Sequence, residues 1–390
     1  MVDRWVPIAG AHRRPRADNP KPVGPRGTIA GFPSVVAAAA MAAHDRGAMT
    51  SASLDRLLAL LLAALAATGL VSLLVGSPGS AWLFVLHDLL AGTLAAAVVV
   101  KLAGSLPRAV RGRRWLRLGV AVPMSVAVVA SIVAGFVWVA GGSLVWVDLG
   151  VIRWTLLTAH VWLGLLVVPL AVAHLVRARW RLLRPGPAAP TRTVARLRSR
   201  RAVLAGGGLL AASAGLVVLA AGLDRISGGI RRFTGSRWLP EGSPAVPTTF
   251  LGEATPVVDA AAWRLVVDGA VDRPLRLDLD GLRAIHGGAD LTAVLDCTAG
   301  WAIEDTWHGA PLADVLDRAG VGRAASRVTV TSVTGWSASL DLADARRCLL
   351  AWATAVGTLP AEHGAPLRLV TPDHRGLEWV KWVASVEVVE

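Results

Sequence analysis

Five long apolar stretches constrain this chain more than any other feature of its 390-residue sequence. Each has about 20 residues or more, the length that an α-helix needs to cross the hydrocarbon core of a bilayer. The stretches are Leu57–Gly76, Ala81–Val100, Leu118–Gly141, Trp154–Val176 and Ala202–Gly222. They predict an all-α domain of five transmembrane helices. The hydrophobic content of 54% agrees with this, because soluble proteins contain about 45–50%.

The net charge of +13 is unevenly placed and predicts how the helices are oriented. Arginines crowd the loops after the second and fourth stretches, whereas the loops after the first and third carry few charges. Since positive loops stay in the cytoplasm, we expect a cytoplasmic amino terminus and an extracytoplasmic domain after the fifth helix, in the cell membrane. That outer domain contains more acidic than basic residues, which argues against nucleic-acid binding.

These patterns divide the chain into five parts. We expect a disordered cytoplasmic tail at residues 1–48 and a four-helix membrane domain at residues 49–180. A basic loop at 181–201 and a fifth helix at 202–222 follow, and the outer domain takes residues 223–390. An alternative for the first part is that translation starts at Met49. The sequence Ser199–Leu204 resembles a twin-arginine export signal, although a cytoplasmic loop is also expected to be basic.

Three histidines lie inside the apolar stretches, where a polar ring usually has a function. His87 and His160 each lie six residues after the outer start of their helix, so both are about 9 Å deep. Two imidazoles at one depth on two helices can ligate a haem iron from both sides. His174 lies 14 residues after His160 on nearly the same face, and Lys101 occupies the equivalent depth in the second helix.

With these histidines, the four-helix part resembles the bacterial cytochrome b561 family, whose members hold b haems between helices. The resemblance implies one haem b, ligated by His87 and His160, with His174 as the candidate ligand of a second haem. In that family the inner haem takes another histidine from the first helix, and Leu57–Gly76 contains none. The alternative is that these histidines form hydrogen bonds between helices.

The outer domain alternates short β-rich runs with turns and short helices, which predicts a mixed α+β fold. We expect strands at Trp263–Asp268, Leu291–Cys297, Arg327–Val333, Leu367–Thr371 and Trp379–Val389, and helices at Leu312–Ala319 and Leu342–Ala351. The two cysteines of the chain, Cys297 and Cys348, are too few for a disulfide scaffold or an all-cysteine metal site.

Several motifs follow one another in this domain: Leu-Asp-Cys297-Thr-Ala-Gly-Trp301, Trp307-His-Gly-Ala-Pro-Leu312, His363-Gly-Ala-Pro-Leu-Arg368 and Gly376 to Trp382. In this order they resemble the molybdopterin-binding domain of the sulfite oxidase and protein-methionine-sulfoxide reductase family, over about residues 245–390. The resemblance implies that Cys297 is the catalytic thiolate that binds molybdenum. It also implies that His363, Arg368 and Lys381 hold the pterin phosphate, with Trp379 and Val380 lining the same turn.

The sequence also departs from that family. Thr248-Thr249-Phe250 stands where an Asn-rich segment usually helps to hold the pterin, and no dimerisation domain follows Glu390. The substrate-binding arginines cannot be assigned by the resemblance, and Arg237 is only a candidate.

Simpler roles for the outer-domain residues stay open. Instead of binding a metal, Cys297 could form a disulfide with Cys348 or be a buried free thiol. Cys348 is expected to lie on an apolar helix. The alternative for Arg368 and Lys381 is that both are ordinary solvent-exposed charges at the ends of strands. His308 and His374 fit turn or surface positions better than metal coordination.

Together these features predict a membrane-anchored molybdopterin-dependent oxidoreductase. It would transfer an oxygen atom to or from an S-oxide, N-oxide or sulfite-type substrate and exchange electrons with membrane quinone through haem b. One alternative is a haem-only electron carrier whose outer domain binds a partner, and another is a membrane anchor without cofactors. The oligomeric state is open.

Overall fold

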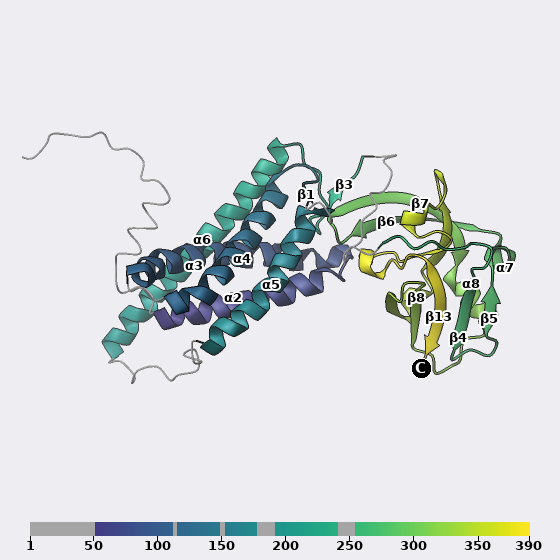
Figure 1. Ribbon diagram of the computed structural model, residues 1–390, viewed down its shortest axis with the longest axis horizontal. Helices are drawn as coiled ribbons and strands as arrows, with labels where there is room; N and C mark the ends of the chain where they lie inside the picture. Colours follow the sequence, from purple (N-terminus) through teal and green to yellow (C-terminus); the bar gives the residue numbers. More distant parts are fainter. Residues whose placement is uncertain (1–50, 112–114, 149–152, 178–191, 241–253) are drawn as a thin grey trace, which may run out of the picture. The chain divides into compact units, whose positions relative to one another are not determined.

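Long helices followed by two β-sheets make up the computed structural model, which describes residues 51–111, 115–148, 153–177, 192–240 and 254–390 (Figure 1). Ala43–Glu390 form one unit and Met1–Ala42 a second. The expected tail of 1–48, residues 178–191 and the departure at Thr248-Thr249-Phe250 lie outside the described residues.

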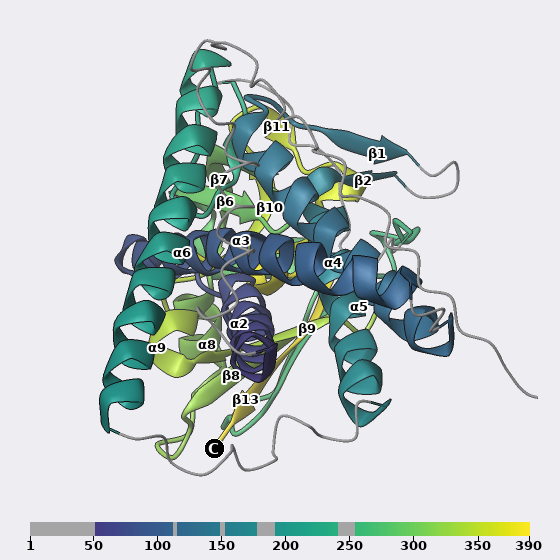
Figure 2. The ribbon, with the colours of Figure 1, turned by 90° about the vertical axis from the view of Figure 1, so that its left-hand side faces the viewer.

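Five helices in the described part are long and apolar enough to cross a membrane. They are α2 (Ser51–Ser72), α3 (Ala81–Arg111), α4 (Trp115–Ala140), α5 (Leu156–Arg177) and α6 (Arg192–Ile226). α3 packs against both α2 and α6, and α4 packs against α5 (Figure 2). The five expected apolar segments are therefore helical, which is compatible with a multi-pass membrane protein.

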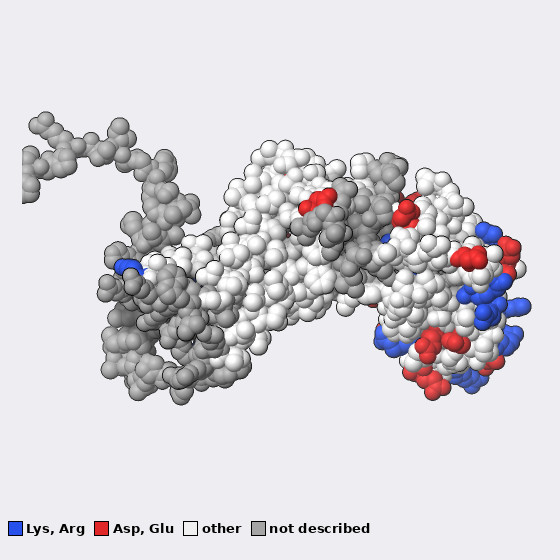
Figure 3. Space-filling model, viewed as in Figure 1, with Lys and Arg blue, Asp and Glu red and all other residues white. Residues whose placement is uncertain are grey.

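The outer faces of these helices are apolar. Leu60, Trp82 and Val218 are each more than half exposed. Figure 3 shows a mainly uncharged surface over the helices, while acidic and basic side chains gather on the C-terminal domain. Exposed apolar area of this extent is costly in water, so the surface is compatible with that of a multi-pass membrane protein.

The helix ends differ from the ends of the apolar stretches. α2 ends at Ser72 and not at Gly76, α3 continues past Val100 to Arg111, and α6 begins at Arg192. The Arg200-Arg201 pair therefore lies within α6 and not in a loop before it. The physical reason is that hydropathy marks only the apolar part of a helix, whereas arginine is itself a good helix former.

The C-terminal domain contains a six-stranded and a five-stranded sheet. In the first, β11, β10, β7 and β3 are neighbours in that order, with β12 paired to β10 and β6 to β7. In the second, the order is β5, β4, β13, β8 and β9. The strands are β3 (Arg237–Trp238), β4 (Leu265–Gly269), β5 (Leu275–Leu277), β6 (Ala289–Cys297), β7 (Trp301–Pro311), β8 (Arg327–Ser332), β9 (Ser337–Asp341), β10 (Leu349–Thr354), β11 (Gly357–Thr358), β12 (Arg368–Val370) and β13 (Val383–Val389).

Short helical segments connect these strands. They are α7 (Leu279–His286), α8 (Leu312–Ala319), α9 (Leu342–Ala345) and the 3₁₀ turns η3 (Ala361–His363) and η4 (Gly376–Glu378). Before α3 there is another 3₁₀ turn, η1 (Pro78–Ser80), and a small hairpin of β1 (Trp146–Asp148) and β2 (Arg153–Thr155) joins α4 to α5.

The core of this domain lies between the two sheets. Leu265 and Val330 of one sheet and Leu350 of the other belong to a single buried cluster, which α8 completes with Leu312 and Leu316. Successive residues of a strand point to opposite faces, so the neighbours of Leu350 face away from this cluster. They join a second cluster on the other face of the six-stranded sheet, formed around Trp301, Trp307 and Trp379.

The structure corrects one expected element. The run Leu342–Ala351 is not one helix, because α9 ends at Ala345 and the strand β10 begins at Leu349. Leu349 to Trp352 are buried on both sides and pair with β7 and β12. A short, continuous apolar run does not distinguish a buried helix from a buried strand, which is why the prediction was wrong. Cys348 lies in the turn between these elements and not on a helix.

Candidate functional site

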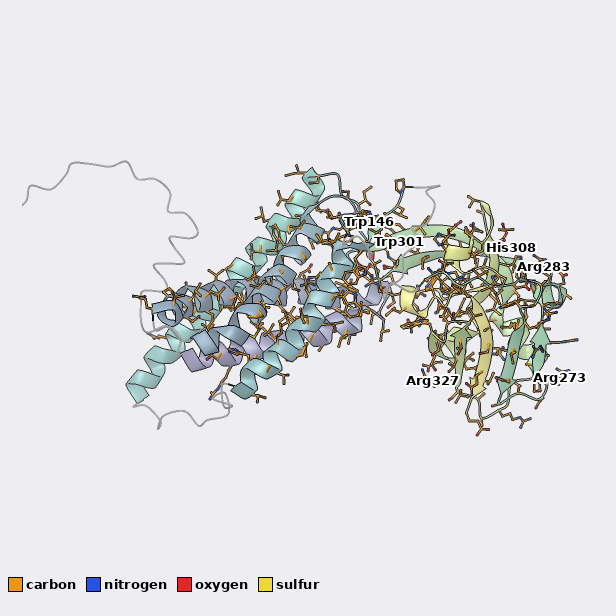
Figure 4. The ribbon with its side chains drawn as sticks, in the orientation of Figure 1. Trp146, Arg273, Arg283, Trp301, His308 and Arg327 are labelled. Atoms are coloured by element: carbon orange, nitrogen blue, oxygen red, sulfur yellow. The ribbon has the colours of Figure 1, made fainter. Side chains whose placement is uncertain are left out.

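Cys297 is the last residue of β6, at the edge where this strand turns into β7. Its backbone pairs with Trp301 across the hairpin, and its carbonyl accepts a hydrogen bond of 2.8 Å from the Gly300 amide. Gly300 has φ +95°, a conformation that favours glycine. The tight turn therefore holds Cys297, which is half-buried, at the end of the strand. Figure 4 shows Trp301 at this end of the hairpin and His308 further along β7.

The two cysteines of the chain have different surroundings. Both lie in the described part, and no disulfide joins them, which excludes the bridge considered above. Burial raises the pKa of the Cys348 thiol to about 12, and this thiol donates to the Asp344 carbonyl oxygen at 3.3 Å. Cys348 is therefore an inert core thiol, because reactivity and metal binding require the thiolate.

Arg368, at the start of β12, is a buried cation beside Cys297. Its side chain lies 5.5 Å from the ring centroid of Trp307 and 5.7 Å from that of Trp379. One terminal nitrogen donates to the His363 carbonyl oxygen at 2.9 Å, while the buried Nε has no hydrogen-bond partner among the described residues. Burial lowers the pKa of Arg368 to about 10, and the nearby Cys297 thiolate acts in the opposite direction. The guanidinium thus stays charged at neutral pH and keeps a donor for an anion.

The fold brings His363 and Lys381 to the same place. His363 ends η3, and a Cβ on the following Gly364 would come within 3.1 Å of the Lys381 Cα. The Trp382 amide donates to the Gly364 carbonyl oxygen at 3.2 Å, and the Lys381 ammonium lies 5.4 Å from the Trp382 ring centroid. Lys381 is half-buried. An ammonium and a guanidinium therefore flank one turn of the chain.

Trp379 and Val380 form the wall between these cations. The Val380 carbonyl oxygen accepts from the Leu369 amide at 2.8 Å, next to Arg368 in sequence. Both Trp379 and Val380 are buried. The residues predicted for the pterin, namely His363, Arg368, Trp379, Val380 and Lys381, are thus adjacent in the structure, and Cys297 lies near the Arg368 guanidinium.

A buried polar network precedes Cys297, and sequence reasoning missed it. Asp296 is fully buried and accepts hydrogen bonds from Thr234 at 2.7 Å, Ser236 at 2.6 Å and Arg375 at 3.2 Å. The residue after Arg375 is Gly376, where a Cβ would lie 3.1 Å from the Cys297 Cα. A carboxylate at a buried position of a strand requires hydrogen-bond partners. Asp296, inside an apolar strand, was therefore the residue from which the sequence could have predicted this network.

The turn after Cys297 packs against the ends of the long helices. The Thr155 hydroxyl donates to the Ala299 carbonyl oxygen at 2.6 Å, and the Arg237 amide donates to the Gly300 carbonyl oxygen at 2.8 Å. A Cβ on Gly300 would lie 2.4 Å from the Trp138 ring, so only glycine permits this approach. Arg237, the candidate substrate ligand, forms an ion pair with Asp224 and donates to the Trp138 carbonyl oxygen. These contacts give it a structural role at this junction.

A cavity of about 1320 Å³ runs inside the helical bundle, and His87, His160 and His174 all line it. His87 of α3 and His160 of α5 lie together, with ring centroids 6.3 Å apart and ring planes at 82°. At the other end, Thr298 and Arg375 line the same cavity. The cavity therefore extends from the histidines to the residue that follows Cys297.

Hydrogen bonds fix how the two imidazoles face the cavity. The Nδ1 of His160 lies 2.8 Å from the Ser131 carbonyl oxygen, which only accepts. The Nδ1 of His87 lies 2.8 Å from the Thr68 hydroxyl oxygen, whose own hydrogen is donated to the Ala64 carbonyl oxygen. Both Nδ1 atoms therefore act as donors, which leaves the Nε2 lone pairs available. Metal-ligating histidines in proteins are usually oriented in this way.

Comparison with known proteins identifies the C-terminal domain. Residues 252–390 match the model of the oxidoreductase molybdopterin binding domain family. The uncharacterized oxidoreductase YuiH of Bacillus subtilis is 31% identical over 144 residues, which cover 36% of this chain and 72% of that protein. The chain belongs to the molybdopterin-binding oxidoreductase family.

Two further relatives are named for sulfoxide reduction. The catalytic subunit MsrP of the protein-methionine-sulfoxide reductase of Xanthomonas campestris is 27% identical, over 35% of this chain and 48% of that protein. The putative protein-methionine-sulfoxide reductase subunit YedZ1 of Azospira oryzae is 30% identical, over 34% of this chain and 50% of that protein. The chain spans about half the length of these two relatives.

These matches confirm that the protein is a molybdenum-cofactor-dependent oxidoreductase. The residues present fit this cofactor. A thiol at a strand end suits a soft metal, and the unpartnered Nε of buried Arg368 suits a phosphate, which a guanidinium binds with a planar fork.

Proposed function

We propose that this protein is a membrane-anchored, molybdopterin-dependent sulfoxide reductase that receives electrons from membrane quinol through haem b. One observation supports it most. The cavity that His87 and His160 line also reaches Thr298 and Arg375, and Arg375 donates to the Cys297 carbonyl oxygen at 3.3 Å. Two redox sites within one chain, joined by such a cavity, suit electron delivery from the membrane to an outer catalytic domain.

In the outer domain we assign Cys297 as the catalytic thiolate that holds molybdenum. Arg368, His363 and Lys381 would bind the pterin and its phosphate, since they place two cations around one turn. Trp379 and Val380 would exclude water from that turn, because both are buried there. When bound, the molybdenum cofactor supplies two-electron oxygen-atom-transfer chemistry, and the protein orients it and tunes its surroundings.

In the bundle we assign His87 and His160 as the ligands of one haem b. These two imidazoles, which come from two different helices, would hold the haem iron between them. The 6.3 Å between the His87 and His160 centroids agrees with this, and so does the hydrogen bonding of their Nδ1 atoms. When bound, the haem supplies one-electron chemistry.

His174 lines the same cavity deeper in the bundle, together with Lys101 and Asp55. Lys101 forms an ion pair with Asp55. In the family that the bundle resembles, the inner haem takes a histidine from the first helix, and Leu57–Gly76 contains none. We therefore assign one haem, and we assign the inner part of the cavity to electron exchange with quinone.

The substrate proposal rests on the relatives. MsrP and YedZ1 are both named for methionine-sulfoxide reduction, which favours a free or protein-borne sulfoxide over an N-oxide or sulfite. The net reaction would consume two electrons and two protons per sulfoxide and release the sulfide and water.

The location rests on charge and hydropathy. The basic loops and the apolar helix surfaces support a cell-membrane protein with a cytoplasmic amino terminus and an extracytoplasmic domain of residues 223–390. Arg200 and Arg201, within α6, would serve as a twin-arginine export signal for that domain.

Metal content, spectra and turnover of the purified full-length protein test the proposal. We expect about one molybdenum and one haem b per chain, and oxidation of pre-reduced haem when methionine sulfoxide is added. Cys297→Ser should lose molybdenum and keep the b-type bands, whereas His87→Ala should do the reverse. Wild-type protein that lacks the b-type bands would contradict the haem assignment. Wild-type protein that turns over sulfite or an N-oxide but no sulfoxide would contradict the substrate assignment.

A further inference from the structure

Arg375 connects the helical bundle to the backbone of Cys297, and the proposed function assigns it no role in positioning Cys297 or tuning the metal. Its side chain is buried, and its two terminal nitrogens point to different parts of the chain. One donates to the Ser72 carbonyl oxygen at 2.9 Å, and the other donates to Asp296 at 3.2 Å and to the Cys297 carbonyl oxygen at 3.3 Å.

On the bundle side, Arg375 caps the end of α2. Ser72 is the last residue of this helix, and the last carbonyls of a helix have no partner within it. A cation at this end is also favoured by the helix dipole. The chain after α2 then approaches the backbone beside Arg375, since a Cβ on Gly76 would lie only 3.1 Å from the Arg375 amide nitrogen.

The same guanidinium faces α3. Its carbon lies 6.0 Å from the ring centroid of Phe84, which is three residues before His87 and therefore on the same face of the helix. Phe84, His87 and Arg375 all line the bundle cavity. One side chain thus contacts two long helices and the strand that carries Cys297.

On the catalytic side, Arg375 places a positive charge next to the backbone carbonyl of Cys297. Asp296 balances this charge, and Ser236 accepts a further bond from Arg375 at 3.2 Å. The buried Nε of Arg375 has no partner among the described residues. The Nε atoms of Arg237 and Arg368 are in the same situation, so an unpartnered Nε is shared by the buried arginines around this loop.

We propose that Arg375 is a positioning residue that fixes the Cys297 loop to the ends of α2 and α3 and sets the reduction potential of the metal that Cys297 binds. Hydrogen bonds and charges around a ligand orient it and tune the metal, and a nearby positive charge favours the reduced state. The proposal rests on the assignment of Cys297 as the molybdenum ligand and is independent of the haem.

The test is a redox titration of the molybdenum signal in the full-length protein, followed by electron paramagnetic resonance. Arg375→Met should lower the midpoint potential, with molybdenum content retained. A tenfold change in the one-electron equilibrium constant corresponds to a shift of about 59 mV in the midpoint potential. We expect Arg375→Met to lower the midpoint potential by at least this amount. Asp296→Asn should raise the potential, and Arg375→Lys should stay closer to wild type than Arg375→Met.

Arg232 offers a matched control. Its Nε lies 3.6 Å from the other carboxylate oxygen of Asp296, and its side chain is 14% exposed, against 3% for Arg375. Arg232→Met removes the same charge from the same carboxylate and should shift the potential less. A second variant, Gly76→Val, should displace the Arg375 backbone and lower the potential without any change in charge.

Three outcomes would overturn the proposal: an unchanged potential in Arg375→Met, an equal shift in Arg232→Met, or a loss of molybdenum in Arg375→Lys. The last would show that Arg375 only supports folding of the site. If Cys297→Ser retains its molybdenum, the proposed function fails first, so the two failures are distinguishable.

Discussion

Arginines in low-dielectric surroundings define the catalytic domain at the scale of single residues. Arg368 lies between two tryptophan rings with an orphan Nε, and Arg375 shares Asp296 with two hydroxyl groups. A guanidinium suits such positions better than an ammonium, because it is less strongly hydrated and stays charged. Buried guanidinium groups therefore surround the loop that carries Cys297.

His374, next to Arg375, leads to a prediction on pH. The hydrogen bond that His374 Nδ1 donates to the Glu378 carboxylate, at 2.8 Å, raises the pKa of His374 above its ordinary value of about 6.5, against the effect of burial. A raised pKa in the folded state means that the stabilisation is complete below about pH 6.5 and is lost as the pH rises through the folded-state value.

We therefore expect His374→Gln to lower the free energy of unfolding near pH 6 by about 1 kcal/mol or less, the range for a partly exposed ion pair. The difference from wild type should shrink toward pH 8.5. Thermal unfolding of both proteins at the two pH values measures this. Glu378→Gln should reproduce the pattern, and a deficit that grows with pH would contradict it.

At the scale of elements, glycines determine how closely the helices approach the histidines. A Cβ on Gly135 of α4 would lie 3.1 Å from the His160 ring, and one on Gly69 of α2 would lie 3.5 Å from the His87 ring. Small residues at such positions let helices pack closely, and here they make room for two imidazoles. The β6–β7 hairpin uses glycine in the same way at Gly300, where the strand turn meets Trp138.

Gly135→Val should therefore displace His160 and remove most of the b-type absorbance, while molybdenum content is retained. We expect haem affinity to fall by about 10- to 100-fold, as for other changes that misplace a ligand. Reduced-minus-oxidised spectra of purified protein measure this. Gly215→Ala in α6 is the control, since no atom of the described residues lies within 4 Å of its added Cβ. Full haem content in Gly135→Val would count against His160 as a ligand.

At the scale of the whole molecule, the catalytic loop and the long helices are built together. Thr155, Arg237 and Arg375 each hydrogen-bond a carbonyl oxygen between Cys297 and Gly300. Thr155 lies on the β1–β2 hairpin between α4 and α5, and Arg375 also donates to the Ser72 carbonyl oxygen at the end of α2, so the helical part contributes to the geometry of the loop. This arrangement requires the ends of the helices that meet the loop to lie on the same side of the membrane as the C-terminal domain.

A topology reporter tests that requirement. Alkaline phosphatase fused after Glu390 should be active, because the C-terminal domain is expected outside the cytoplasm. The same reporter placed after Arg184, in the basic segment between α5 and α6, should have at most about a tenth of that activity. The two activities are compared between fusion proteins that are expressed at equal levels. Activity confined to the Arg184 fusion would reverse the proposed orientation.

The sequence determined those features that depend on neighbouring residues or on one motif. Apolar stretches predicted the five long helices, because hydropathy is a local property. Ordered motifs around Cys297, Arg368 and Lys381 predicted a molybdopterin oxidoreductase, which the family match confirms. The equal depth of His87 and His160 followed from counting residues along two helices.

Only the tertiary structure decided which distant residues meet. Arg375 contacts Ser72 across 303 positions of the chain, and Thr155 contacts Ala299 across 144, and no periodicity links such positions. The strand β10, mistaken for part of a helix, was decided by its pairing with β7 and β12. Pairing partners and buried polar networks depend on the packing of the whole chain, so local patterns alone do not reveal them.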